Sequence, residues 1–244
     1  MHWINDLLDR FGLRIYRKKA YSHSLLSYSQ EGEDMILRRI FDGRKKGFYV
    51  DVGAHHPQRF SNTYFFYTRG WRGVNIDAMP GGMDLFNAIR PNDINIEAAI
   101  ASERRAMTYF MFDDPALNSF DEELSRSRDN TAYRIIGRKE IFTRTLAEIL
   151  DEHLASNQEI DFLSIDVEGL DLEVLESNDW GKYRPFCILV ECVAHSLEEI
   201  GKNHVYRYLK EKNYDLFAKT ANTFIFRSKA WNGISVPKTS LQKS

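Results

Sequence analysis

Residues 48–54, Phe-Tyr-Val-Asp-Val-Gly-Ala, decide the fold, because an apolar strand pattern ends there in an acidic residue and a glycine. Apolar side chains at both odd and even positions indicate a strand that is buried on both faces, which is typical of a parallel sheet covered by helices. Gly53 allows a tight backbone turn directly after the strand. The stretch therefore predicts a parallel strand whose carboxyl end lies beside a ligand.

Later segments extend this pattern into an alternation of strands and helices. Further strands are predicted at 73–78, 94–101, 160–166 and 186–192, and helices at 62–69, 80–90, 145–156, 169–178 and 197–212. Two β-prone runs, 214–219 and 223–227, predict a terminal hairpin with an antiparallel strand. The polar stretch 113–140 predicts a mobile insertion near the strand ends. Together these elements predict an α/β fold with a mostly parallel sheet and helices on both faces.

Composition is that of an ordinary globular protein. The chain has 244 residues, of which 43% are hydrophobic and 28% charged, and this balance excludes disorder of the whole chain. The formal net charge of −2 gives no electrostatic argument for a polyanion, so we expect no nucleic-acid partner. We predict a single domain over residues 28–244, preceded by a basic amphipathic helix and connector at 1–27.

The first 19 residues have two interpretations. Apolar residues recur at helical spacing and basic residues lie between them, so the helix could pack on its own domain or on a partner subunit in a homodimer. It could also make a peripheral contact with an anionic membrane surface. No apolar run is long enough to span a membrane or to act as a signal peptide, which predicts a cytoplasmic protein, with the inner face of the membrane as the site of any peripheral contact. Cys187 and Cys192 would lie about 16 Å apart in one strand, which predicts reduced, buried thiols.

The strand ends carry the residues expected to bind a ligand. Asp51 and Gly53 lie at the end of the first strand, and Asp77 ends the second, where a carboxylate can accept from both hydroxyls of a ribose. This pair indicates an adenosine-containing ligand. A nicotinamide-dependent oxidoreductase would fit the same pattern, but the chain lacks the Gly-x-Gly-x-x-Gly motif that such enzymes use to hold the cofactor phosphates.

Other strand ends add a base slot and a group of ionisable side chains. Ala99 lies among small residues that could line a flat slot for a base, and Ser61 is expected to cap a helix whose N–H groups hold a carboxylate. Four ionisable residues are predicted to converge on one rim, which core packing alone does not explain. These are Asp166, Glu168, Glu191 and His195.

Short motifs in a fixed order connect these positions. They are Ser-Gln-Glu-Gly-Glu-Asp at 29–34, Asp-Val-Gly-Ala at 51–54, Ser-Asn-Thr at 61–63, Gly-Trp-Arg-Gly-Val at 70–74 with Ile-Asp at 76–77, Ala-Ile at 99–100, Thr-Leu at 145–146, Ile-Asp-Val-Glu-Gly at 165–169, and Pro185 with Glu191. On these motifs the chain resembles the FkbM family of S-adenosylmethionine-dependent methyltransferases over about residues 28–228. The resemblance implies the class I methyltransferase fold, a Rossmann-like sheet of seven strands in which the C-terminal hairpin supplies the antiparallel strand.

The resemblance also implies roles for individual residues. Asp51 and Gly53 would flank the methionine part of the cofactor, and Asp77 would bind its ribose. Further positions that match the family around the cofactor pocket are Gln30, Asp34, Ser61, Asn62 and Thr63. The chain departs from many methyltransferases at 54–57, Ala-His-His-Pro, where they have further glycines; a stiffer loop is expected, with His55 or His56 facing the substrate.

The family methylates hydroxyl groups, often of sugars in bacterial surface glycans and sometimes of natural products. The expected reaction is therefore in-line methyl transfer to a hydroxyl of a sugar or glycan acceptor, with Asp166, Glu168 or His195 as the base. Asp166 and Glu191 could instead hold Mg²⁺. Methylation of a natural product and a binding module that has lost activity remain alternatives. Four arginines in the insertion, Arg126, Arg128, Arg134 and Arg138, either form a solvated face or steer an anionic acceptor.

Overall fold

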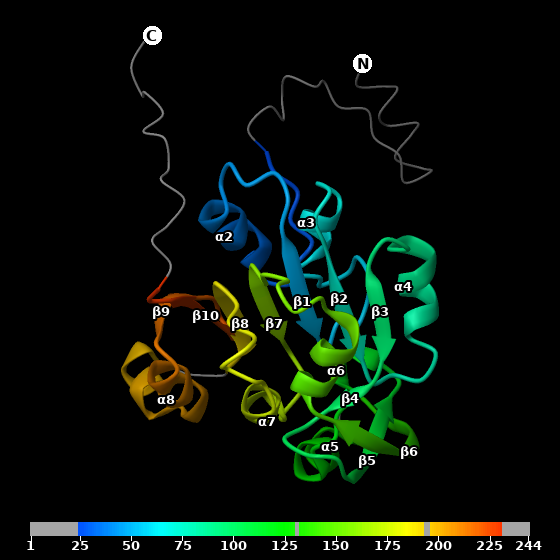
Figure 1. The fold of residues 1–244 in the computed structure, drawn as a ribbon. Helices are drawn as coiled ribbons and strands as arrows, with labels where there is room; N and C mark the ends of the chain where they lie inside the picture. The colour runs from blue at the N-terminus through cyan, green and yellow to red at the C-terminus, as the bar shows by residue number, and fades with distance from the viewer. Residues whose placement is uncertain (1–23, 130–131, 193–195, 231–244) are drawn as a thin grey trace, which may run out of the picture.

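The protein is described by a computed structural model over residues 24–129, 132–192 and 196–230. Its centre is a seven-stranded sheet of order β3-β2-β1-β7-β8-β10-β9 (Figure 1). The five neighbouring strands from β3 to β8 pair in parallel, and β10 is antiparallel to both of its neighbours. The strands are β1 (Phe48–Val52), β2 (Arg72–Asp77), β3 (Ile94–Glu97), β7 (Phe162–Ile165), β8 (Cys187–Glu191), β9 (Tyr214–Lys219) and β10 (Thr223–Ser228). The predicted α/β sheet and its terminal hairpin are confirmed.

Strand β1 lies at the centre because both of its faces are apolar. Val50 pairs in register with Val74 of β2 and with Leu163 of β7. Val50 and Val52 pack into one core cluster, whereas Tyr49 packs into a second cluster on the opposite face. Alternation along a strand sends successive side chains to opposite faces, so this strand needs a helical layer on each side.

Helices supply those two layers. Apolar residues of α2 (Glu33–Ile40) and α3 (Tyr64–Tyr67) join the Tyr49 cluster, and α6 (Leu146–His153), α7 (Asp171–Glu176) and α8 (His204–Glu211) join the Val50 cluster. Helix α4 (Met83–Ile89) packs beside β3, with Met83 and Phe86 against Ala54. A 3₁₀ helix, η3 (Leu197–Lys202), precedes α8. The predicted helical cover on both faces is thus confirmed.

A second, three-stranded sheet of order β4-β6-β5 lies beyond the arrowheads of β1, β2 and β3 (Figure 1). It corrects two expectations. The strand predicted at 94–101 is split, because β4 (Ala99–Ile100) leaves the large sheet and pairs with β6. The insertion at 113–140, predicted as mobile, contains regular secondary structure: η2 (Pro115–Leu117), α5 (Glu122–Arg128) and the first six residues of β6 (Ile135–Arg144), which pairs with β5 (Ala106–Phe112). Strand β6 is exposed over much of its length, so its sequence is polar and lacks a strand pattern.

Two smaller predictions concern thiols and membranes. Cys187 and Cys192 are both buried and free, as predicted. Within the described ranges no helix has the length and apolarity needed to cross a membrane. The amphipathic helix predicted in residues 1–19 lies outside the described residues.

Candidate active site

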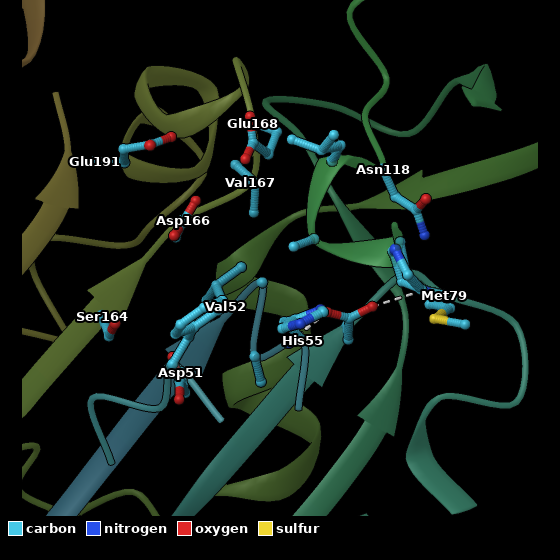
Figure 2. A pocket seen from close by; sticks show the side chains of 18 of the residues that line it. Asp51, Val52, His55, Met79, Asn118, Ser164, Asp166, Val167, Glu168 and Glu191 are labelled. Atoms are coloured by element: carbon cyan, nitrogen blue, oxygen red, sulfur yellow. Dashed lines mark hydrogen bonds between the residues drawn. The ribbon is translucent and has the colours of Figure 1, made fainter. Parts of the chain in front are cut away.

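A cavity of about 380 Å³ opens where β1, β2, β7 and β8 end (Figure 2). The small sheet and the segment after β5 close its other side with Tyr109, Asn118 and Phe120. Nine residues predicted from the sequence line this cavity, namely Gln30, Asp51, Gly53, Asn62, Asp77, Ala99, Asp166, Glu168 and Glu191. His195, also predicted, lies outside the described residues. The strand-end rule predicted most of these residues, and Gln30 and Asn62 were predicted from the family resemblance.

Gly53 makes the turn from β1 into the cavity. Its φ of +81° is a left-handed conformation that favours glycine, and a Cβ at this position would lie 1.7 Å from the carbonyl oxygen of Asp166. The ends of β1 and β7 can approach this closely only because residue 53 has no side chain.

Asp51 is held from behind by hydroxyl groups. The Thr63 hydroxyl donates a hydrogen bond to its Oδ2 at 2.8 Å, and the Ser164 hydroxyl also bonds its carboxylate. Asn62 continues this chain by donating from Nδ2 to Ser164 Oγ at 3.1 Å. Asp51 is 5% exposed, and burial raises the pKa of its carboxyl group.

Arg90, which the sequence reasoning missed, supports this group. Its guanidinium is fully buried and pairs with Asp93 at 2.9 Å. It also donates to Thr63 Oγ1 at 3.0 Å, so it fixes the hydroxyl that holds Asp51. The only local sequence feature that points to this ion pair is the three-residue spacing between Arg90 and Asp93. That spacing does not show that the pair is buried.

Three predicted cofactor residues lie behind the cavity wall instead of lining it. Thr63 holds Asp51 as described, and Ser61 Oγ accepts the N–H groups of Thr63 and Tyr64 at 3.3 and 3.1 Å. We expected these N–H groups to hold a ligand carboxylate. They are not available for this, because they already donate to Ser61 Oγ. Asp34 accepts from the backbone N–H of Tyr28 at 2.7 Å and from the hydroxyls of Ser27 and Ser29, and so orders the segment before Gln30.

Asp77 lines the cavity at the end of β2, the strand beside β1. Its two oxygens accept the backbone N–H groups of His55 and Met79, each at 2.8 Å (Figure 2). Burial raises the pKa of Asp77 despite these bonds. Each carboxylate oxygen can accept more than one hydrogen bond, so Asp77 remains able to bind hydroxyl groups of a ligand.

The two consecutive histidines have different positions. His55 lines the cavity in a left-handed conformation with φ of +51°, and its Nε2 is buried without a hydrogen-bond partner among the described residues. Burial lowers the pKa of His55, which favours the neutral ring. His56 instead accepts the N–H groups of Gln58 and Arg59 at Nδ1 and shapes the turn. An unpartnered buried nitrogen at a cavity wall is a place where a ligand can supply the missing bond.

Asp166, Glu168 and Glu191 form a carboxylate cluster on one side of the cavity (Figure 2). One oxygen of each lies within 4.8 Å of the others. Asp166 is exposed to the open cavity, yet the protein that surrounds the cavity and the charge of Glu191 raise its pKa above the usual value. Burial together with the charge of Glu168 raises the pKa of Glu191 to about 7. Two carboxyl groups this close titrate as a pair, so at neutral pH the pair tends to retain a proton.

The loop that carries the carboxylate cluster is constrained by its neighbours. Glu168 has a left-handed φ of +53°, and its carboxylate pairs with Arg128 Nη2 at 2.7 Å. The Asp171 carboxylate accepts the N–H groups of Val167 and Gly169, each at 3.2 Å. Strain of this kind persists only where surrounding contacts impose it.

The arginines of the insertion do not act as one group. Arg126 pairs with Glu122 on the exposed surface of α5, and the Arg138 guanidinium lies over the Phe110 ring. Arg128 reaches the carboxylate cluster through its ion pair with Glu168. Helix α5 therefore affects the cavity through the ion pair that Arg128 forms with Glu168.

Several solved methyltransferase structures are similar to the chain at low sequence identity. The chain is similar to the precorrin-6y C5,15-methyltransferase of Geobacter metallireducens, with 10% identity and a TM-score of 0.40, covering 79% of this chain and 84% of that one. It is similar to an O-methyltransferase of Bacillus cereus in complex with SAH, with 11% identity and a TM-score of 0.40, covering 91% and 95% of the two chains. It is similar to a TehB-like SAM-dependent methyltransferase of Corynebacterium glutamicum, with 10% identity and a TM-score of 0.39, covering 92% and 97%. No curated protein matches the chain.

A family model gives the assignment. Residues 51–216, well over half of the chain, match the methyltransferase FkbM domain. The matched range begins at Asp51 and includes the ends of β1, β2, β7 and β8, which form the cavity. The chain therefore belongs to the FkbM family of S-adenosylmethionine-dependent methyltransferases.

Proposed function

We propose that this methyltransferase transfers the methyl group of S-adenosylmethionine to a hydroxyl oxygen of a sugar or glycan. The observation that carries the proposal is a cavity with a carboxylate cluster inside and exposed aromatic rings among its lining residues. Phe60 and Tyr133 line the cavity and are 43% and 39% exposed. A sugar ring has C–H faces that pack on aromatic rings and hydroxyl groups that donate to carboxylates, so it matches both features.

The cavity residues fit the cofactor. Asp77 would accept the ribose hydroxyls, Ala99 would lie against the base, and Gly53 would let the backbone approach the methionine part. The unpartnered Nε2 of His55 is a further polar atom that a bound nucleoside can satisfy. When bound, S-adenosylmethionine supplies a methyl group on a positively charged sulfur.

Asp166 is the proposed base. It would accept the acceptor hydroxyl proton while the hydroxyl oxygen bonds to the methyl carbon and the carbon–sulfur bond breaks. The Asp166–Glu191 pair that retains a single proton still has one ionised carboxylate, and that carboxylate can accept the hydroxyl proton. Glu191 is hydrogen-bonded to Asp166, so the two carboxyl groups hold their proton as a pair. General-base assistance of this type contributes roughly 10²–10⁴ in rate.

The same oxygens also suit a divalent cation. Mg²⁺ prefers hard oxygen ligands, and Asp166, Glu168 and Glu191 each offer one. A bound Mg²⁺ would lower the pKa of the acceptor hydroxyl and reduce the need for a protein base. Full activity in excess chelator would contradict this use of the carboxylate cluster.

The test is an acceptor screen with the full chain. Monosaccharides, oligosaccharides and hydroxylated natural products are incubated with S-adenosylmethionine, and products are read by mass spectrometry as O-methylated compounds with S-adenosylhomocysteine. The Asp166→Asn variant is expected to lose at least 100-fold in kcat while keeping its affinity for the cofactor. Asp215→Asn, a change on the exposed side of β9, is the matched control and should keep full activity.

Other results would replace the proposal. Methylation of natural products without any sugar would favour the second acceptor class. Failure of the folded protein to bind S-adenosylmethionine by calorimetry would favour a non-catalytic binding module. Full activity of Asp166→Asn would remove Asp166 as the base.

A further inference from the structure

A second pocket lies on the far side of the molecule from the cofactor cavity. It is formed by the last turn of α2 and the loop after it, together with the end of α3 and the start of β2, and has a volume of about 370 Å³. Figure 1 shows these loops at the end of the sheet where the parallel strands begin, opposite the small sheet. We call it the basic pocket and define it by Arg38, Arg44, Lys45, Arg69, Phe65 and Trp71.

The sequence around the basic pocket is strongly positive. Residues 38–46 and 69–72 contain seven lysines and arginines and one acidic residue, whereas the whole chain has a net charge of −2. The acidic residue, Asp42, also lines the pocket, and its carboxylate is paired with Arg39 at 3.4 Å. Local positive charge in a concave surface raises the concentration of anions there.

Three of the pocket cations have no carboxylate partner in the part of the chain that the structure describes. Arg44 is the exception, because it pairs with the buried Asp161 at 2.7 Å. Among the described residues, no carboxylate lies within 4.0 Å of Arg38, Lys45 or Arg69. Their charges are therefore available to an anion from outside the protein.

Arg69 is held in place by an aromatic ring. Its guanidinium lies 3.4 Å from the centre of the Phe65 ring, and Nη1 donates to the Phe65 carbonyl oxygen at 2.9 Å. The Trp71 side chain, 2% exposed, is a buried apolar residue that lines the same pocket. Arg69 is exposed, and a guanidinium that is already held in one position loses less conformational freedom on binding an anion than a free surface cation does.

We propose that the basic pocket binds a phosphate ester. A phosphate group carries up to two negative charges and several acceptor oxygens, and three unpaired cations around one hollow match that chemistry. The pocket lies at the opposite end of the sheet from the cofactor cavity, so its ligand would not compete with the cofactor. The ester could belong to a phospholipid headgroup or to a soluble compound, and the experiment separates these two sources.

The test measures binding of two probes to the full chain. Vesicles of phosphatidylcholine with 30 mol% phosphatidylglycerol are used in flotation at about 0.1 M salt, where surface charges are partly screened. Glycerol 3-phosphate is titrated by calorimetry. The Arg38→Gln/Lys45→Gln variant removes two pocket cations, and Lys202→Gln/Arg207→Gln removes the same charge from η3 and α8. Binding of S-adenosylhomocysteine to each variant checks that the cofactor site is folded.

The expected result is a loss of about tenfold or more in affinity for at least one probe in Arg38→Gln/Lys45→Gln, with a change below about twofold in the control variant. A loss for vesicles alone identifies a lipid headgroup, and a loss for glycerol 3-phosphate identifies a soluble ester. If the full chain binds neither probe, or if both variants bind alike, the proposal is overturned. Vesicle binding that does not depend on Arg38 and Lys45 would belong to another part of the chain.

Discussion

Gly53 shows how one residue sets the shape of the cavity. In Gly53→Ala the new Cβ would meet the Asp166 carbonyl oxygen at 1.7 Å in a left-handed conformation, so the ends of β1 and β7 must separate. We expect a loss of roughly 2–5 kcal/mol in the free energy of unfolding, with loss of S-adenosylhomocysteine binding. Gly70→Ala is the matched control, because Gly70 has a similar φ of +89° and an added Cβ there would meet no other described residue within 4 Å. It should lose about 1 kcal/mol. Urea unfolding measures both, and equal losses would contradict the steric argument.

The raised pKa of Glu191 predicts that the free energy of unfolding depends on pH. Its folded pKa of about 7 lies above the unfolded value near 4.3, so the folded state binds more protons between these values. The free energy of unfolding should therefore fall as pH rises from about 4.5 to 7 and then level off for this group. Glu191→Gln keeps the neutral form at every pH. It should be more stable than the parent by about 1–3 kcal/mol at pH 8, and the difference should nearly vanish at pH 4. Urea unfolding across this range measures it, and a constant difference would contradict the raised pKa.

At the scale of elements, Arg90 joins helix α4 and strand β3 to the loop before α3. Arg90→Ala leaves the Asp93 carboxylate buried without its cation, which should lower the free energy of unfolding by about 3–5 kcal/mol. It should also weaken cofactor binding, because Thr63 loses the group that orients it beside Asp51. Arg104→Ala removes an exposed ion pair to Glu148 and should change stability by less than about 1 kcal/mol. Both variants are measured by urea unfolding. A similar loss in the free energy of unfolding in both would show that the effect of Arg90→Ala does not come from the burial of this ion pair.

The strands differ in how far the sequence predicts them. Strands β1, β7 and β8 are buried at nearly every position, and this pattern is visible without a structure. Strand β6 has exposed residues on its outer face and a partner, β5, that precedes it by more than 20 residues. Its polar sequence resembles a loop because the pairing that makes it a strand is not local.

For the whole molecule, the cavity predicts that cofactor binding stabilises the fold. Its lining comes from both sheets, so a ligand that binds only the folded chain raises the free energy of unfolding. At 100 times its Kd, S-adenosylhomocysteine should add about 2.7 kcal/mol, measured as a shift of the urea midpoint. At the same concentration Asp77→Ala should lose most of this gain, whereas Asp215→Ala should keep it. An equal gain in Asp77→Ala would remove Asp77 from the binding site.

The sequence by itself determined the α/β fold, the terminal hairpin and the strand ends that carry Asp51, Asp77 and Asp166. These follow from local apolar patterns and from the rule that the carboxyl ends of parallel strands share one edge.

Only the tertiary structure decided which side chains face the cavity. It placed His55 in the wall and His56 in the turn, and it buried Arg90 beneath Thr63. It also brought Asn62 to Ser164, although they are 102 residues apart in the chain. The physical reason is that side-chain direction and burial depend on packing between distant segments, which no local pattern records.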